Sequence, residues 1–115
     1  MKKTFYKLEL GPYPIEAYYA PTKKSWRRLL RKLNLEDEPY SKGVGMMTTY
    51  HPHGEQTNPI CIITVNCEGM DNCVRVGIIA HECVHVFQEL IERIGENVPS
   101  PEFEAYTIQS MVTNV

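Results

Sequence analysis

The sequence predicts a small α+β fold with a few-stranded, mostly antiparallel sheet and three helices. Short segments rich in β-branched and aromatic residues come first, an amphipathic helical pattern separates them, and two helical stretches close the chain. The length of 115 residues corresponds to one domain with a single core, and no repeat or low-complexity segment divides it. We therefore expect a single domain over residues 1–115.

The first third of the chain predicts two strands and a helix. Residues 4–10 and 14–20 carry β-branched and aromatic side chains on either side of Gly11-Pro12, which favours two extended segments that could form a hairpin. Thr22 is a suitable N-cap for a helix that continues to about Asn34. The polar residues 35–42 then predict a connecting loop.

The middle of the chain predicts a second pair of strands. Residues 43–50 and 60–66 have strand character, and the intervening residues 51–59 are rich in turn formers. A long helix follows from about Asp71 to Ile94.

The long helix is expected to end at Gly95, and a second helix should begin shortly afterwards. Ser100 is a good N-cap, and Pro101 suits the first helical position because its missing N–H would have no partner there. The long helix and this final helix are thus joined by a short linker.

The most informative motif lies inside the long helix. His81-Glu82-Cys83-Val84-His85 reads H-E-x-x-H. Residues four apart share one face of a helix, so His81 and His85 can present two imidazole nitrogens to one tetrahedral zinc ion. Glu82 would then stand beside the metal, where a carboxylate can act as a general base and acid in hydrolysis.

The surroundings of the motif weigh against a chance match. Residues 74–80 and 86–87 contain a single charge, Arg75. A helix that is apolar on most sides is expected in a protein interior, where two histidines and a carboxylate are costly unless they are hydrogen-bonded or bind a metal. The sequence therefore favours a zinc site over an accidental pattern.

A catalytic zinc site of this kind needs a third protein ligand, and the final helix offers two. Glu102 and Glu104 both follow Pro101 in the predicted first turn. Acidic residues are favoured there by the helix dipole alone, so either could also be an ordinary surface residue. Glu104 shares its helical side with Ile108 and Met111, whereas Glu102 aligns with Tyr106 and Gln109.

These two motifs together resemble the gluzincin metallopeptidases, which carry H-E-x-x-H on one helix and a ligand glutamate on the next. The sequence is also similar to short phage-encoded H-E-x-x-H proteins that continue into an E-x-x-A-Y helix, over about residues 44–113. The resemblance implies a minimal zincin-like core with a backing helix, one zinc ion, and Glu102 as the third ligand, with Glu104 as the fallback. Tyr106 stands where the family has an aspartate that supports a histidine ligand, so that support is unassigned.

The resemblance also implies where substrate would bind. In that family an edge strand of the sheet aligns an extended peptide, and the hairpin within residues 43–66 is the corresponding segment. Donors for the oxyanion could come from Tyr50, His51, His53 or Tyr106, although each is also an ordinary turn, surface or packing residue.

Charge and composition restrict the other functional classes. The net charge is −2 and the pI is about 6.1, so no nucleic-acid partner is expected. One basic cluster alternates with apolar residues at helical spacing, which favours a solvated helix face over binding to nucleic acid or an acidic partner. Its members are Lys23, Lys24, Arg27, Arg28, Arg31 and Lys32.

No apolar run reaches the roughly 20 residues of a membrane span, and the N-terminus lacks a hydrophobic signal core. We therefore expect a cytoplasmic protein, in the host cytoplasm if phage-encoded, with no membrane partner. In a reducing cytosol the four cysteines are expected to be free thiols.

The sequence thus favours a zinc metallopeptidase that hydrolyses peptide bonds in a peptide or protein substrate, with Glu82 as general base. The alternative is a zinc-stabilised, non-catalytic interaction module, such as a phage factor that binds a host protein.

Overall fold

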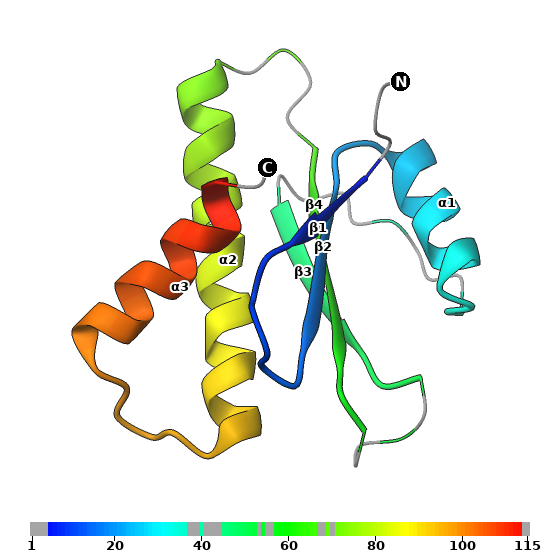
Figure 1. Ribbon diagram of the computed structural model, residues 1–115. Coiled ribbons are helices and arrows are strands. Elements are labelled where there is room, and N and C mark those ends of the chain that lie inside the picture. Colours follow the sequence, from blue (N-terminus) through cyan, green and yellow to red (C-terminus); the bar gives the residue numbers. More distant parts are fainter. Residues whose placement is uncertain are drawn as a thin grey trace.

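The computed structural model describes residues 5–36, 40, 45–52, 54, 57–66, 69 and 71–113. A four-stranded sheet lies between helix α1 on one face and helices α2 and α3 on the other (Figure 1). The α+β class predicted from the sequence is confirmed. The elements are β1 (Tyr6–Leu8), β2 (Glu16–Ala20), α1 (Lys23–Lys32), β3 (Gly45–Tyr50), β4 (Ile60–Val65), α2 (Asn72–Ile94) and α3 (Pro101–Thr113).

The sheet is mixed, with strand order β1-β2-β4-β3. Strands β1 and β2 pair antiparallel, as do β3 and β4, which confirms both predicted strand pairs. The central pair, β2 and β4, is parallel, and the chain passes through α1 and β3 between them, so the sheet is antiparallel in two of its three pairings. Strand β3 occupies one edge of the sheet, and this position determines the candidate site.

Helix α1 begins where the sequence predicts. Thr22 and Ser25 form a capping box, in which the Ser25 backbone N–H donates to Thr22 Oγ1 and the Thr22 N–H donates to Ser25 Oγ, both at 3.0 Å. Trp26, Leu29 and Leu30 are buried in a cluster between α1 and the sheet. Helix α1 therefore has one face fixed against the sheet and one face in solvent.

Helix α2 has local signals at both ends. The Asp71 carboxylate accepts a hydrogen bond from the Cys73 N–H at 2.8 Å, and Gly95 ends the helix with a φ of 76°, a left-handed conformation that glycine adopts without steric cost. Its buried face packs on the sheet in the larger hydrophobic cluster. The buried apolar residues of α2 are Ile79, Cys83, Val86, Phe87 and Leu90.

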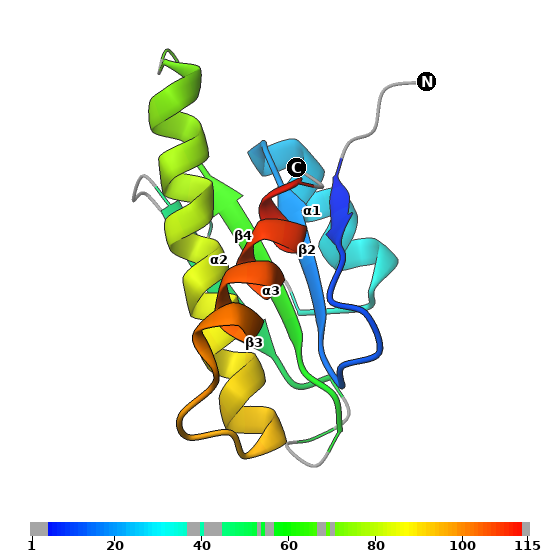
Figure 2. The same cartoon turned by 60° about the vertical axis from the view of Figure 1, so that its left-hand side comes forward.

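Helix α3 lies beside α2 on the same face of the sheet (Figure 2). Ser100 caps it, as the sequence predicts, because its Oγ accepts from the Phe103 N–H at 3.2 Å. The Phe103 ring lies between those of Phe87 and Tyr13, with centroids 5.5 Å away in each case. Aromatic contacts of this kind fix the start of α3 against the C-terminal half of α2.

In the described part of the chain, no helix combines the length and the apolar character needed to cross a membrane.

Candidate metal and active site

The two histidines of the motif lie together on the solvent-facing side of α2. Their ring centroids are 5.0 Å apart and the ring planes are inclined by 76°. His85 Nδ1 lies 2.9 Å from Gln88 Oε1. Because an amide oxygen only accepts, this contact favours a proton on Nδ1 and leaves the lone pair on Nε2, the form of imidazole that binds a metal.

Gln88 is therefore the orienting partner of His85, a role that the sequence left unassigned. The signal was present in the sequence, because residues three apart are neighbours on a helix surface. The H-E-x-x-H motif ends at His85, so Gln88 lies three residues beyond it.

The expectation that the whole motif is buried is wrong for the histidines. His81 and His85 are exposed, and Val74 and Val76 in the first turns of α2 are each 51% exposed. The apolar residues of α2 include exposed valines as well as those of its core face. The amino-acid composition of the helix therefore predicted more burial of the histidines than the structure shows. Of the two histidines and the glutamate of the motif, only Glu82 is buried, with 6% of its surface exposed.

Glu82 faces the edge strand β3 at a point where that strand has no side chain. A Cβ added at Gly45 would lie 3.2 Å from Glu82 Oε1 and 2.7 Å from Ile78 Cγ2. Among the described residues, none forms a hydrogen bond or ion pair with the Glu82 carboxylate. The carboxylate oxygens are not among the fully buried unpaired atoms, so they keep contact with solvent through the groove while the rest of the side chain is buried.

A shallow groove of about 500 Å³ runs between β3 and α2, and Glu82 and His85 both line it. The strand contributes backbone and two methionines, and the helix contributes polar and acidic side chains. The lining residues are Gly45, Met46, Met47, Glu82, His85, Gln88, Glu89 and Glu92. The groove thus joins an edge strand, an unpaired carboxylate and an imidazole in one concave surface.

The structure does not bring a third ligand to the histidines. In the portion of the chain that the structure describes, no three His, Cys, Asp or Glu side chains form a group able to hold a metal ion. Glu102 is exposed in the first turn of α3, and Glu104 is half-buried. The third ligand therefore stays a prediction.

The position of α3 explains this separation. Phe103 at the start of α3 contacts Phe87 of α2. Since each helical residue turns by about 100°, Phe87 projects about 160° away from His85. Helix α3 therefore begins on the flank of α2 that faces away from His85.

The predicted oxyanion donors that the structure describes, Tyr50, His51 and Tyr106, do not line the groove. Tyr50 is buried in the cluster on the α1 face of the sheet, which is the opposite face from α2. His51 is exposed just after β3, and Tyr106 is 64% exposed on α3. His53 lies outside the described residues.

Two cysteines, Cys61 and Cys83, are buried in the hydrophobic cluster between α2 and the sheet. Burial and, to a smaller extent, the negative charge of Glu82 together raise the pKa of the Cys83 thiol to about 12. The pKa of Cys61 is also raised to about 12, mainly by burial, with the hydrogen bond to Thr49 lowering it and the charge of Glu89 raising it. Cys61, Cys73 and Cys83 are free thiols, and Cys67 lies outside the described residues.

Comparisons with protein-family models, curated proteins and solved structures give no match. The functional argument therefore depends on the geometry of the groove and on the residues of the motif.

Proposed function

We propose that the protein is a zinc-dependent metallopeptidase that hydrolyses peptide bonds in the groove between β3 and α2. The observation that carries this proposal is the environment of Glu82. The Glu82 side chain is largely buried, while its carboxylate has no partner among the described residues and opens onto the groove beside His85. A general base needs this combination of restricted position and free lone pairs.

The histidines suit a metal site in part. His81 and His85 share one face of α2 with rings in contact, and Gln88 favours the metal-binding tautomer of His85. We propose that they hold one zinc ion together with Glu102, or with Glu104 as the fallback, which requires the start of α3 to leave Phe87 and dock on the histidine side of α2. Bound zinc would supply Lewis-acid polarisation of the scissile carbonyl and would lower the pKa of water.

Glu82 would take the proton from the attacking water and return it to the leaving amine. The edge of β3 offers a row of backbone groups beside this carboxylate, because β3 pairs on one side only with β4. A peptide added along this edge would be held in extended form within reach of Glu82. The absence of a side chain at Gly45 keeps the strand and the carboxylate close.

The test compares wild type with Glu82→Gln for zinc content and for cleavage of a broad peptide library. We expect the variant to keep its zinc and to lose hydrolysis, because Gln keeps the shape of the side chain but cannot accept a proton from water. His81→Ala with His85→Ala is the matched control and should lose both zinc and activity. Wild-type protein that contains zinc and cleaves nothing would contradict the catalytic proposal.

The second candidate is a non-catalytic interaction module, such as a phage factor that binds a host protein in the host cytoplasm. The open position of the groove favours it, since both histidines are exposed and no element among the described residues covers them. This candidate predicts no turnover and no effect of Glu82→Gln on partner binding. Purified protein that neither contains zinc nor gains stability on zinc addition would contradict every zinc-based function considered.

A further inference from the structure

Helix α1 carries a charge distribution that the groove on the other face of the sheet does not explain. Ser25, Trp26, Leu29 and Leu30 are its buried residues. All the remaining positions of the helix are exposed, and every one of them is a cation. These are Lys23, Lys24, Arg27, Arg28, Arg31 and Lys32.

This arrangement is costly for the isolated protein. Lys23, Arg27 and Arg31 repeat every four residues, as do Lys24, Arg28 and Lys32, so like charges are neighbours along both rows. Each such pair destabilises a helix by about 0.2–0.5 kcal/mol. The first turn of α1 contains no acidic residue and begins with two lysines, although the helix dipole disfavours cations there.

Among the described residues, nothing compensates for this repulsion. The ion pair between Lys7 and Glu16 involves no residue of α1. Lys32 lies over the Phe5 ring at 5.3 Å, which offsets the charge of one cation only. Half of the Lys and Arg residues of a chain with net charge −2 are thus gathered on one face, where no described acidic residue pairs with them.

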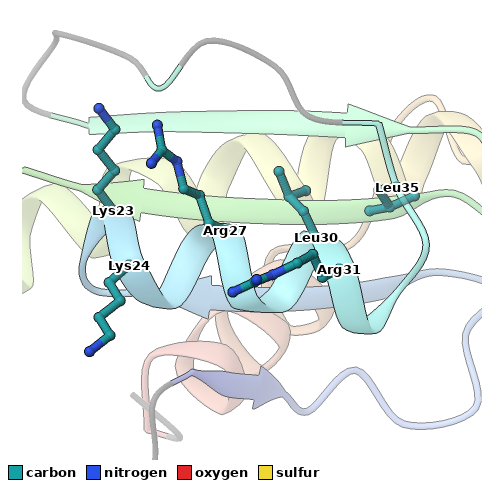
Figure 3. Close-up of a pocket in the computed structure, with 6 residues that line it drawn as sticks. All are labelled: Lys23, Lys24, Arg27, Leu30, Arg31 and Leu35. Carbon is teal, nitrogen blue, oxygen red and sulfur yellow. The ribbon is translucent and has the colours of Figure 1, made fainter.

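Four of the six cations also line a groove. A groove of about 790 Å³ is lined by Lys23, Lys24, Arg27, Leu30, Arg31 and Leu35. Lys23, Arg27 and Leu30 point to the same side of α1 (Figure 3). The groove therefore combines a cationic rim with apolar side chains rather than presenting charge alone.

We propose that this groove on α1 binds an acidic segment of a partner protein in which Asp or Glu alternates with apolar residues. Carboxylates would pair with Arg27, Arg31 and the lysines, and an apolar side chain would contact Leu35, which is partly exposed beside the buried Leu30. A nucleic-acid backbone has no apolar group for Leu35. Helix α1 also presents no exposed aromatic ring on which a base could stack.

The experiment measures binding by fluorescence anisotropy at several salt concentrations. The probes are a labelled 20-residue peptide of Glu and Leu, the same peptide with each Leu replaced by Gly, and a 20-base-pair DNA duplex. We expect the Glu/Leu peptide to bind more tightly than either of the others, with affinity that falls as salt rises.

Paired variants on the same helix make the test specific to the groove. Arg27→Gln with Arg31→Gln removes two cations that line it, whereas Arg28→Gln with Lys32→Gln removes two that do not. We expect about a tenfold loss of peptide affinity for the first pair and a clearly smaller loss for the second, with circular dichroism showing that both variants fold. Equal losses for the two pairs, tighter binding of the DNA duplex, or no binding of the Glu/Leu peptide would each overturn the proposal.

Discussion

Gly45 of β3 and Glu82 of α2 lie so close that a single methyl group at Gly45 would stand 3.2 Å from the Glu82 carboxylate oxygen. The same methyl group would be 2.7 Å from Ile78 Cγ2, closer than carbon atoms approach in folded proteins. The missing side chain thus allows the edge strand to pass directly over the helix. This contact places the edge strand and the largely buried Glu82 side chain side by side in the wall of the groove.

Replacing Gly45 with Ala should therefore lower the free energy of unfolding by about 1–3 kcal/mol, the usual cost of overpacking. The added methyl must displace either the strand or Ile78, whose Cγ2 branch is fixed close to the helix backbone. Urea unfolding of the variant and of wild type, followed by circular dichroism, measures the difference.

Two further variants show whether this cost arises from the proposed contact. In a double-mutant cycle, Ile78→Ala should relieve the clash, with a coupling energy of at least about 0.5 kcal/mol. Gly77→Ala is the matched control, because a Cβ there meets nothing within 4 Å, and we expect it to be neutral or stabilising by up to about 1 kcal/mol. Unchanged stability of Gly45→Ala would show that β3 and α2 are further apart than described.

The third zinc ligand can be assigned by comparing Glu102→Ala with Glu104→Ala. We expect Glu102→Ala to lower zinc affinity by about 100-fold or more, since even the loss of an outer-shell partner costs 10-fold to 100-fold. Glu104 is half-buried on the side of α3 that also carries Met111, so its loss should affect stability more than zinc binding. Zinc titration and thermal unfolding of both variants separate the two effects.

The reverse result would reassign the site. If Glu102→Ala keeps full zinc stoichiometry and Glu104→Ala loses it, Glu104 is the ligand. Retention of zinc by both variants would mean that neither residue of α3 completes the site.

Most elements of the fold could be predicted because their signals are local. Thr22, Asp71 and Ser100 act as caps, and Gly95 ends α2, each through contacts within four residues. The parallel pairing of β2 with β4 was not predicted, because it joins segments about 40 residues apart and no local pattern specifies it.

The candidate site was predictable in its chemistry but less so in its environment. The motif gives His81, Glu82 and His85 on one side of a helix, yet sequence alone does not say which flank a strand will cover. Strand β3 covers the Glu82 flank and leaves the histidines in solvent. The docking of α3 through Phe103 and Phe87 is likewise a tertiary contact, and it decides where the candidate ligands of α3 lie.

The buried thiols give a prediction that is independent of metal and substrate. At pH 8, iodoacetamide should modify exposed Cys73 in the folded protein and spare Cys61 and Cys83, because burial raises the pKa of both thiols from 9.0 to about 12 and leaves almost no reactive thiolate. Peptide mapping by mass spectrometry resolves each site. Rapid labelling of Cys83 at this pH would contradict the burial of that face of α2.

The same pKa values fix the direction of the pH dependence of stability. Unfolded protein releases the thiol protons near pH 9, whereas folded protein retains them to about pH 12. The folded state therefore binds more protons in this window, so these thiols stabilise the fold fully below pH 9 and progressively less as the pH rises toward 12. We expect Cys83→Ala to lose less stability than wild type between pH 8.5 and about 10.5 in urea unfolding, because the variant has one fewer thiol to deprotonate on unfolding. Parallel pH profiles for the two proteins would show that Cys83 titrates normally in the folded state.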